Sequence, residues 1–106
     1  IGNRETVIQS GPLKIDLARH LVTRNDEEVR LTVLEFNLLA YLAAHADHVL
    51  THQAILNQIW GFSESDHVEY LRVYIGQLRK KLEINPDDPQ IILTEPGIGY
   101  RFRTMD

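Results

Sequence analysis

The residues with the clearest chemical potential lie between positions 69 and 80, where polar side chains and a glycine recur at helical spacing. The spacing is i, i+3, i+4, i+7, i+8 and i+11, and the residues are Glu69, Arg72, Val73, Gly76, Gln77 and Lys80. Residues at that spacing share one face of a helix. Arg72 can direct two parallel hydrogen bonds to guanine, and Gln77 can do the same to adenine. The face therefore contains side-chain types that read base edges in duplex DNA.

Gly76 lies in the middle of this face. A glycine in a helix interior costs about 1 kcal/mol relative to alanine, so its presence needs a reason. Glycine is favoured where another surface approaches the backbone closely. We therefore group Gly76 with Arg72 and Gln77 as candidate base-reading residues.

Candidate phosphate ligands surround the same face. Arg79, Lys80 and Lys81 cluster at its C-terminal end, and Tyr70 and Tyr74 flank it with their hydroxyl groups. Basic groups and hydroxyls are common donors to phosphate oxygens. Cations in a last helical turn usually serve only to complement the helix dipole, so the basic cluster alone is more typical of an ordinary stable helix than of a DNA-binding one.

The charge of the chain permits a polyanionic ligand without arguing for one. The net charge is −4, and residues 1–66 carry 5 basic and 9 acidic side chains, whereas residues 67–106 carry 6 of each. Between residues 67 and 83 the basic side chains outnumber the acidic ones by 2. Neutralising phosphate requires a local excess of basic groups rather than a basic total.

The elements that must position these residues begin with four short strands. Alternating apolar and polar residues predict strands at 6–9, 13–17, 20–24 and 28–31, separated by turn signals at 10–12 and 25–26. The pattern becomes helical after Thr32. Thr32 and Glu35 form a capping box, and leucines at helical spacing extend this first helix to about Ala46.

Two further helices and a hairpin complete the chain. Thr51 begins a second helix that ends at Gly61, and Asp66 is positioned to cap a third helix that Asn85 and Pro86 terminate. Strand-like runs at 90–94 and 100–103 follow, joined at 95–98 by a sequence with proline second and glycine third, as in a type II turn. This order predicts an α+β domain, a winged helix-turn-helix with an N-terminal four-stranded antiparallel sheet, three helices and a C-terminal β-hairpin wing.

Other chemistries receive little support. The chain has no cysteine, which excludes thiolate metal sites and is typical of a reducing cytosol. His45, His48 and His52 have ligand-like spacing, but a helix boundary separates them and their rings need not converge, so we predict no metal and no cofactor. No phosphate loop, nucleophile motif or membrane-length apolar run is present, so we expect a cytoplasmic, non-enzymatic protein with no membrane partner.

Five segments give the chain a specific likeness to a known family. They are residues 31–39, 49–51, 59–61, 78–82 and 97–102. Across nearly its whole length the chain resembles the C-terminal DNA-binding domain of the OmpR/PhoB class of response regulators. Within that class, residues 70–79 and 94–100 most resemble regulators of Kdp potassium-uptake operons, which implies control of a potassium-transport operon.

The resemblance implies that the third helix lies in the major groove of double-stranded DNA, with Arg72 and Gln77 at base-contact positions. The residues expected at the DNA backbone are Trp60, Tyr70, Tyr74, Arg79, Lys80, Thr94, Gly97, Tyr100 and Arg101. A tryptophan at the end of a short helix is also a typical core residue, so packing and DNA contact both remain open for Trp60.

The chain departs from the family pattern at three places. Many members have an acidic residue where this chain has Arg72. Many have arginine in place of Gln77 and a polar or basic residue in place of Gly76. Many insert an arginine from the wing into the minor groove, where this chain has Pro96. We therefore expect a different base preference.

The resemblance also implies partners other than DNA. The loop that faces RNA polymerase in the family corresponds to Phe62, Ser63, Glu64, Ser65 and Asp66. Residues 1–5 would be the end of an interdomain linker and residues 6–106 the effector domain, with the receiver domain absent. That receiver, phosphorylated by a cognate histidine kinase, would drive homodimerisation on tandem half-sites, leaving the isolated domain monomeric. The alternative is a winged-helix protein-interaction module that binds no DNA.

Overall fold

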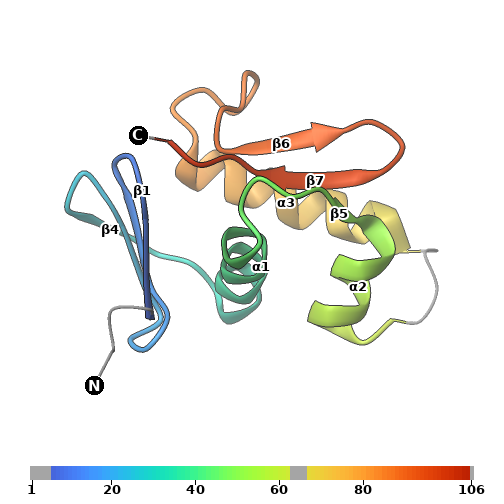
Figure 1. Ribbon diagram of the computed structural model, residues 1–106, viewed down its shortest axis with the longest axis horizontal. Helices are drawn as coiled ribbons and strands as arrows, with labels where there is room; N and C mark the ends of the chain where they lie inside the picture. Colours follow the sequence, from blue (N-terminus) through green and yellow to red (C-terminus); the bar gives the residue numbers. More distant parts are fainter. Residues whose placement is uncertain (1–5, 63–66, 106) are drawn as a thin grey trace.

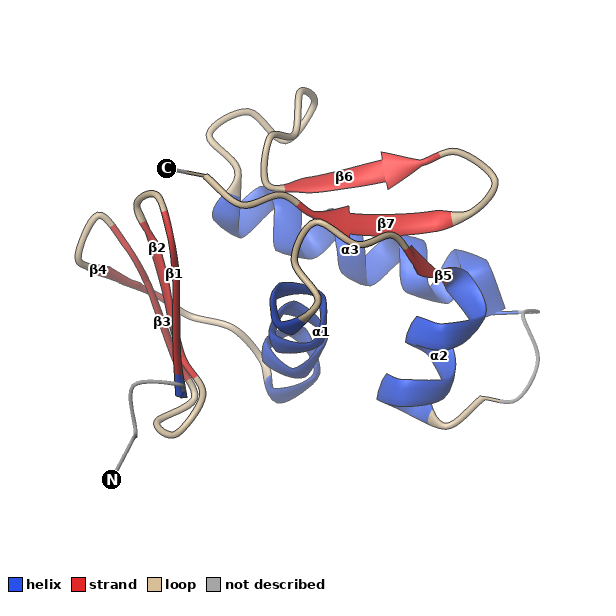
Figure 2. Ribbon diagram, in the orientation of Figure 1, coloured by secondary structure: helices blue, strands red, loops and turns tan. Residues whose placement is uncertain are grey.

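The computed structural model describes residues 6–62 and 67–105, and it has the predicted α+β architecture (Figure 1). A sheet at the N-terminal end is followed by three helices and a C-terminal hairpin. Helix α1 stands between the N-terminal sheet and α2, and the hairpin extends along α3 (Figures 1 and 2).

The N-terminal sheet is an antiparallel meander. Its strands are β1 (Val7–Ser10), β2 (Leu13–Asp16), β3 (Leu21–Arg24) and β4 (Glu27–Val29), in that spatial order. Asn25 and Asp26 have φ of 54° and 68°, the conformation that a two-residue hairpin turn needs and that these residue types tolerate. The four predicted strands are confirmed, with boundaries that differ by at most two residues.

The first two helices begin and end at the predicted caps. In α1 (Val33–Ala44) the Thr32 hydroxyl accepts the Glu35 amide at 3.2 Å, and the Glu35 carboxylate accepts the Thr32 amide at 2.9 Å. In α2 (His52–Trp60) the Thr51 hydroxyl accepts the Ala54 amide at 3.0 Å. Gly61 then ends α2 in the left-handed conformation, with φ of 76°.

Helix α3 (Val68–Leu82) begins differently from the prediction. Its N-cap position is His67 rather than Asp66, which lies outside the described residues, and the His67 side chain makes no capping hydrogen bond within the described part of the chain. The aromatic ring of His67 instead packs on Phe62, with ring centroids 4.0 Å apart.

A second sheet contains a strand that the sequence did not predict. Strand β7 (Gly99–Phe102) pairs on one side with β6 (Ile92–Glu95), forming the wing, and on the other with β5 (Leu50–Thr51). Gly99 makes this second pairing possible, because a Cβ there would lie 1.8 Å from the carbonyl oxygen of Leu50. The base of the wing is therefore attached to the connection between α1 and α2.

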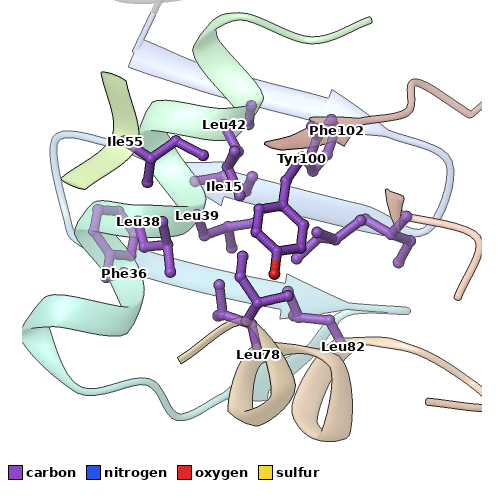
Figure 3. Close-up of a cluster of buried hydrophobic side chains, with 14 of the residues drawn as sticks. Ile15, Phe36, Leu38, Leu39, Leu42, Ile55, Leu78, Leu82, Tyr100 and Phe102 are labelled. Carbon is purple, nitrogen blue, oxygen red and sulfur yellow. The ribbon is translucent and has the colours of Figure 1, made fainter. Parts of the chain in front are cut away.

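The core lies where α1, α3, the N-terminal sheet and β7 converge (Figure 3). Its fully buried side chains come from every layer and include Leu13, Ile15, Leu38, Leu39, Leu42, Ile55, Leu71, Ile75, Leu78, Leu82 and Phe102. Four of them lie on the inner side of α3, at positions 71, 75, 78 and 82. Their burial fixes the rotation of this helix about its axis.

Charged groups fix the C-terminal half of α3 to its neighbours. Lys81 donates to the Glu35 carboxylate on α1 at 2.7 Å, and Arg24 on β3 donates to the carbonyl of Leu82 at 2.8 Å. The Glu83 carboxylate, 5% exposed, accepts the amides of residues 90, 91 and 92. These contacts satisfy polar groups at the helix end that would otherwise be buried without partners.

We predict that Glu35→Gln lowers the free energy of unfolding by about 1–2 kcal/mol at pH 7, because the charged hydrogen bond to Lys81 is lost. Burial raises the pKa of Glu35, but the contacts from Lys81 and Thr32 outweigh it and lower the pKa below 4.5 overall. The stabilisation from a lowered carboxylate pKa is fully present above about pH 4.5 and is lost as the pH falls through the pKa of the folded state.

The measurement is urea unfolding from pH 7 to pH 3. The stability difference between wild type and Glu35→Gln should shrink on acidification, whereas Glu28→Gln, at an exposed position on β4, should behave as wild type throughout. A difference that is constant over this pH range would contradict the assignment.

Candidate nucleic-acid interface

The outer face of α3 is exposed as the spacing predicted. Arg72, Val73, Gln77 and Lys80 are exposed, and Val73 retains 57% of its accessible surface. The opposite stripe, which runs from Leu71 to Leu82, is buried in the core. A helix face that combines an exposed valine, an arginine and a glutamine, with a wing beside it, can enter a DNA groove.

Arg72 is paired within its own helix. Its Nη1 donates to Glu69 Oε2 at 2.6 Å, and the side chains are 61% and 81% exposed. The sequence analysis placed Glu69 on the same face without assigning it this bond. The i, i+3 spacing of an acid and a base is the signal that would have predicted the pair.

Gly76 has open space in front of it. No atom outside its own helix backbone lies within 4 Å of the position that a Cβ would occupy. The glycine is therefore not required by packing inside the domain.

Arg79 lies between α3 and the wing. Its guanidinium donates to the carbonyl of Ile92, at 3.1 Å from Nε and 2.8 Å from Nη2, and to the Thr94 hydroxyl at 2.8 Å. It also lies 5.8 Å from the centroid of the Tyr100 ring. Burial lowers the pKa of Arg79 and outweighs the opposing effects of Tyr100 and Glu83. In the free domain this predicted phosphate ligand connects the two elements of the candidate interface.

The tip of the wing has the predicted turn. Gly97 has φ of 74°, and the Ile98 amide donates to the Glu95 carbonyl at 2.9 Å, as in a type II turn. Pro96, Gly97 and Ile98 are exposed at the tip. On the strands behind it, Arg101 pairs with Glu95 at 3.0 Å.

The remaining predicted backbone ligands differ in accessibility. Thr94 and Tyr70 are exposed and Tyr74 is half-buried, whereas Tyr100 is only 3% exposed and packs in the core. Trp60 is half-buried at the end of α2. The structure therefore leaves Thr94 and Tyr70 accessible and places the ring of Tyr100 in the core.

Trp60 is the centre of an aromatic cluster that joins α2 to the first turns of α3. Its ring lies 5.5 Å from Tyr70, 5.3 Å from Tyr74 and 6.3 Å from Phe62, measured between centroids. The indole Nε1 is buried and has no hydrogen-bond partner in the described part of the chain. Packing is therefore the role that the free domain gives to Trp60.

The predicted polymerase loop is described only at its start. Phe62 packs on Trp60, and its carbonyl accepts a hydrogen bond from Gln53 at 3.0 Å. Ser63, Glu64, Ser65 and Asp66 lie outside the described residues. Elsewhere, residues 6–62 and 67–105 contain no group of three potential metal ligands and no helix long and apolar enough to cross a membrane.

Comparison with known proteins decides the family. The family model described as "Transcriptional regulatory protein, C terminal" matches residues 26–102. The chain belongs to this family. It is a DNA-binding output domain of the OmpR/PhoB type of response regulator, a class whose members regulate transcription.

Several curated relatives match this response-regulator domain over most of its length. The KDP operon transcriptional regulatory protein KdpE of Escherichia coli K12 is 46% identical over 98 residues, which cover 92% of this chain and 44% of that protein. The DNA-binding response regulator MtrA of Mycolicibacterium smegmatis is 38% identical, covering 90% and 42% respectively. The probable transcriptional regulator ycf27 of Galdieria sulphuraria is 41% identical, covering 93% and 40%. The chain thus spans about two fifths of the length of these relatives.

Solved structures confirm the winged-helix fold of the response-regulator domain. The RstA DNA-binding domain of Klebsiella pneumoniae, solved in complex with the RstA box, superposes with a TM-score of 0.86 at 33% identity, covering 92% of this chain and 96% of that one. The response regulator DrrB of Thermotoga maritima, described as an OmpR/PhoB homologue, gives a TM-score of 0.85 at 31% identity, covering 94% and 46%.

We predict that Arg79→Lys loosens the wing of this response-regulator domain. Lysine keeps the charge but cannot reach the Ile92 carbonyl and the Thr94 hydroxyl together, because it lacks the planar fork of arginine. The free energy of unfolding should fall by about 1–2 kcal/mol, and amide hydrogen exchange should accelerate in β6 and β7. Lys80→Ala, at the exposed neighbouring position, should change neither the free energy of unfolding nor the hydrogen exchange of the wing beyond experimental error. Unchanged exchange in the wing of Arg79→Lys would contradict the connecting role.

Proposed function

We propose that the domain binds double-stranded DNA by placing α3 in the major groove, where Arg72 and Gln77 contact base edges. Gly76, which has no side chain, allows a base edge to come close to the helix. The observation that supports this docking is the exposed outer face of α3, where no other part of the domain packs against Gly76. The wing lies beside the same helix and is connected to it by Arg79 (Figure 2). Lys80 and Tyr70, exposed at the edges of this face, would hold the phosphates.

Contacts at the remaining predicted backbone ligands form a second part of the proposal. Thr94 and Gly97 on the wing are exposed and would reach the backbone directly. Trp60 would donate its indole N–H to a phosphate only after the groups that cover Nε1 move, because that atom is buried in the free domain. Tyr74, Tyr100, Arg79 and Arg101 would act mainly by holding the surface that meets the DNA.

The regulated genes are a further proposal. The 46% identity with KdpE supports control of a potassium-transport operon, while relatives named MtrA and ycf27 have comparable coverage at 38% and 41% identity. We favour the potassium-transport operon because the KdpE likeness is highest among these three, and a cytoplasmic location would accompany that function.

The whole protein would act as a two-component regulator. Because the chain spans only about two fifths of its curated relatives, we propose that a receiver domain, phosphorylated by a histidine kinase, lies in the remainder. A receiver dimer would raise the effective concentration of the second effector domain on tandem half-sites, and the isolated domain would remain monomeric. The loop that begins at Phe62 would contact RNA polymerase.

The docking of α3 predicts that base contacts and phosphate contacts respond differently to mutation. Arg72→Ala should weaken binding to the preferred site by about 1–3 kcal/mol and flatten discrimination at one or two base pairs. Lys80→Ala should weaken all duplexes about equally and make the slope of log affinity against log salt shallower by about one.

The measurement is selection from random duplexes followed by titration at several salt concentrations. Asn37→Ala, on the exposed side of α1, is the control and should change neither quantity. An unchanged base preference in Arg72→Ala would show that α3 does not read the groove. Binding without any salt dependence would favour the alternative, a protein-interaction module.

Gly76→Ala separates folding from binding. The added methyl meets no protein atom, so the free energy of unfolding should rise by about 1 kcal/mol through helix propensity. DNA affinity should fall, because the methyl group occupies space that the proposed complex gives to a base edge. Urea unfolding and fluorescence anisotropy with a labelled duplex measure the two effects. A variant that is more stable and binds DNA as tightly as wild type would contradict the proposal that a base edge lies close to Gly76.

A further inference from the structure

The outer face of α3 has an acidic residue where the proposed function places a polyanion. Glu69 is the acidic residue within the sequence of α3, and its side chain is 81% exposed. Glu83, at the C-terminal end, is instead buried and occupied by backbone amides. An exposed carboxylate close to phosphates repels them and makes DNA binding less favourable, so its presence needs a compensating role.

Stability of the free domain does not supply that role. The pair of Glu69 and Arg72 joins two largely exposed side chains, and such pairs contribute on the order of 0–1 kcal/mol. An acid in a first turn also complements the helix dipole, but that effect requires no bond to Arg72. The 2.6 Å hydrogen bond between Arg72 and Glu69 therefore serves mainly to fix the position of the Arg72 guanidinium.

The bond leaves the reading edge of Arg72 available. Glu69 occupies Nη1, so the Nε and Nη2 donors, which lie side by side, can meet N7 and O6 of a guanine. Glu69 Oε1 has no hydrogen-bond partner in the described part of the chain. Three helical residues rise about 4.5 Å, close to the roughly 3.4 Å of one base step, so the two side chains can address neighbouring base pairs.

We propose that Glu69 is a specificity-determining residue for DNA recognition: it holds Arg72 with its Nε–Nη2 edge toward a guanine, and its free oxygen accepts a hydrogen bond from N4 of a neighbouring cytosine. The proposal rests on the proposed docking of α3. The acceptor atoms of other base edges repel the Glu69 carboxylate. Its bond to Arg72 also keeps the guanidinium from binding a phosphate instead of a base. Glu69 thus reduces affinity for DNA in general and increases the contrast between sites.

The test compares Glu69→Gln, Arg72→Ala and the double variant with wild type. Glu28→Gln, which removes an exposed acid on β4, controls for the change in net charge. Each protein is used in selection from random duplexes and then titrated with the preferred site and with mixed duplex DNA at several salt concentrations. Thermal unfolding confirms that the fold is kept.

Glu69→Gln should bind mixed duplex about two- to fivefold more tightly, because one repulsive charge is removed. Its discrimination between the preferred site and mixed duplex should fall about tenfold, and preference at the guanine and cytosine positions should weaken together. In the Arg72→Ala background the same change should leave preference at the guanine position unchanged and weaken only the preference at the cytosine position, so its effect on discrimination should be smaller. Glu28→Gln should match wild type in base preference.

Three results would overturn the inference, and they are distinguishable. If Arg72→Ala flattens base preference and Glu69→Gln does not, Glu69 has no role in specificity while the proposed function stands. If Glu69→Gln has the same effect with and without Arg72, the two residues do not act as a pair. If Arg72→Ala leaves base preference unchanged, the docking of α3 fails and this inference fails with it.

Discussion

Helix α3 has to fill the core on one face while it presents the proposed DNA-binding residues on the other, and the rest of the structure depends on how it meets that constraint. Four of its residues, Leu71, Ile75, Leu78 and Leu82, are at most 1% exposed. A helix turns by about 100° per residue, so a core stripe that is fixed this tightly leaves no freedom in which residues face outward. Packing inside the domain therefore decides that Arg72, Gly76 and Gln77 are presented together. A shift of one residue in the register of the stripe would replace the whole outer face.

Polar contacts hold this helix in place from three directions. Lys81 contacts α1 through Glu35, Arg24 contacts the last carbonyls of α3 from β3, and Arg79 connects the helix to β6. At the other end, the position of α3 rests on rings packed around Trp60. Three hydrogen bonds from Arg79 thus connect α3 to the wing, and the β5–β7 pairing attaches the base of the wing to the connection between α1 and α2.

The net charge of −4 is compatible with DNA binding because of where the charges lie. The acidic excess is in residues 1–66, the part of the sequence that contains the N-terminal sheet and the first two helices. Several basic groups of the second half are occupied inside the domain: Arg79 by the wing, Lys81 by Glu35 and Arg101 by Glu95. Few cations therefore remain for phosphates. A single domain of this kind gains little non-specific affinity, which agrees with the proposal that two copies act together on tandem sites.

The sequence alone was sufficient for several features that depend on near neighbours. The capping box of Thr32 and Glu35, the Gly61 cap, the turn at Gly97 and the outward face of α3 are all local, since each depends on residues a few positions apart. Only the tertiary structure decided the pairing of β5 with β7 across about fifty residues, the buried indole of Trp60 and the use of Arg79 as a connection. A two-residue strand has no pattern of its own, and a side chain such as Arg79 or Tyr100 finds its partners only when the whole core has brought them within reach.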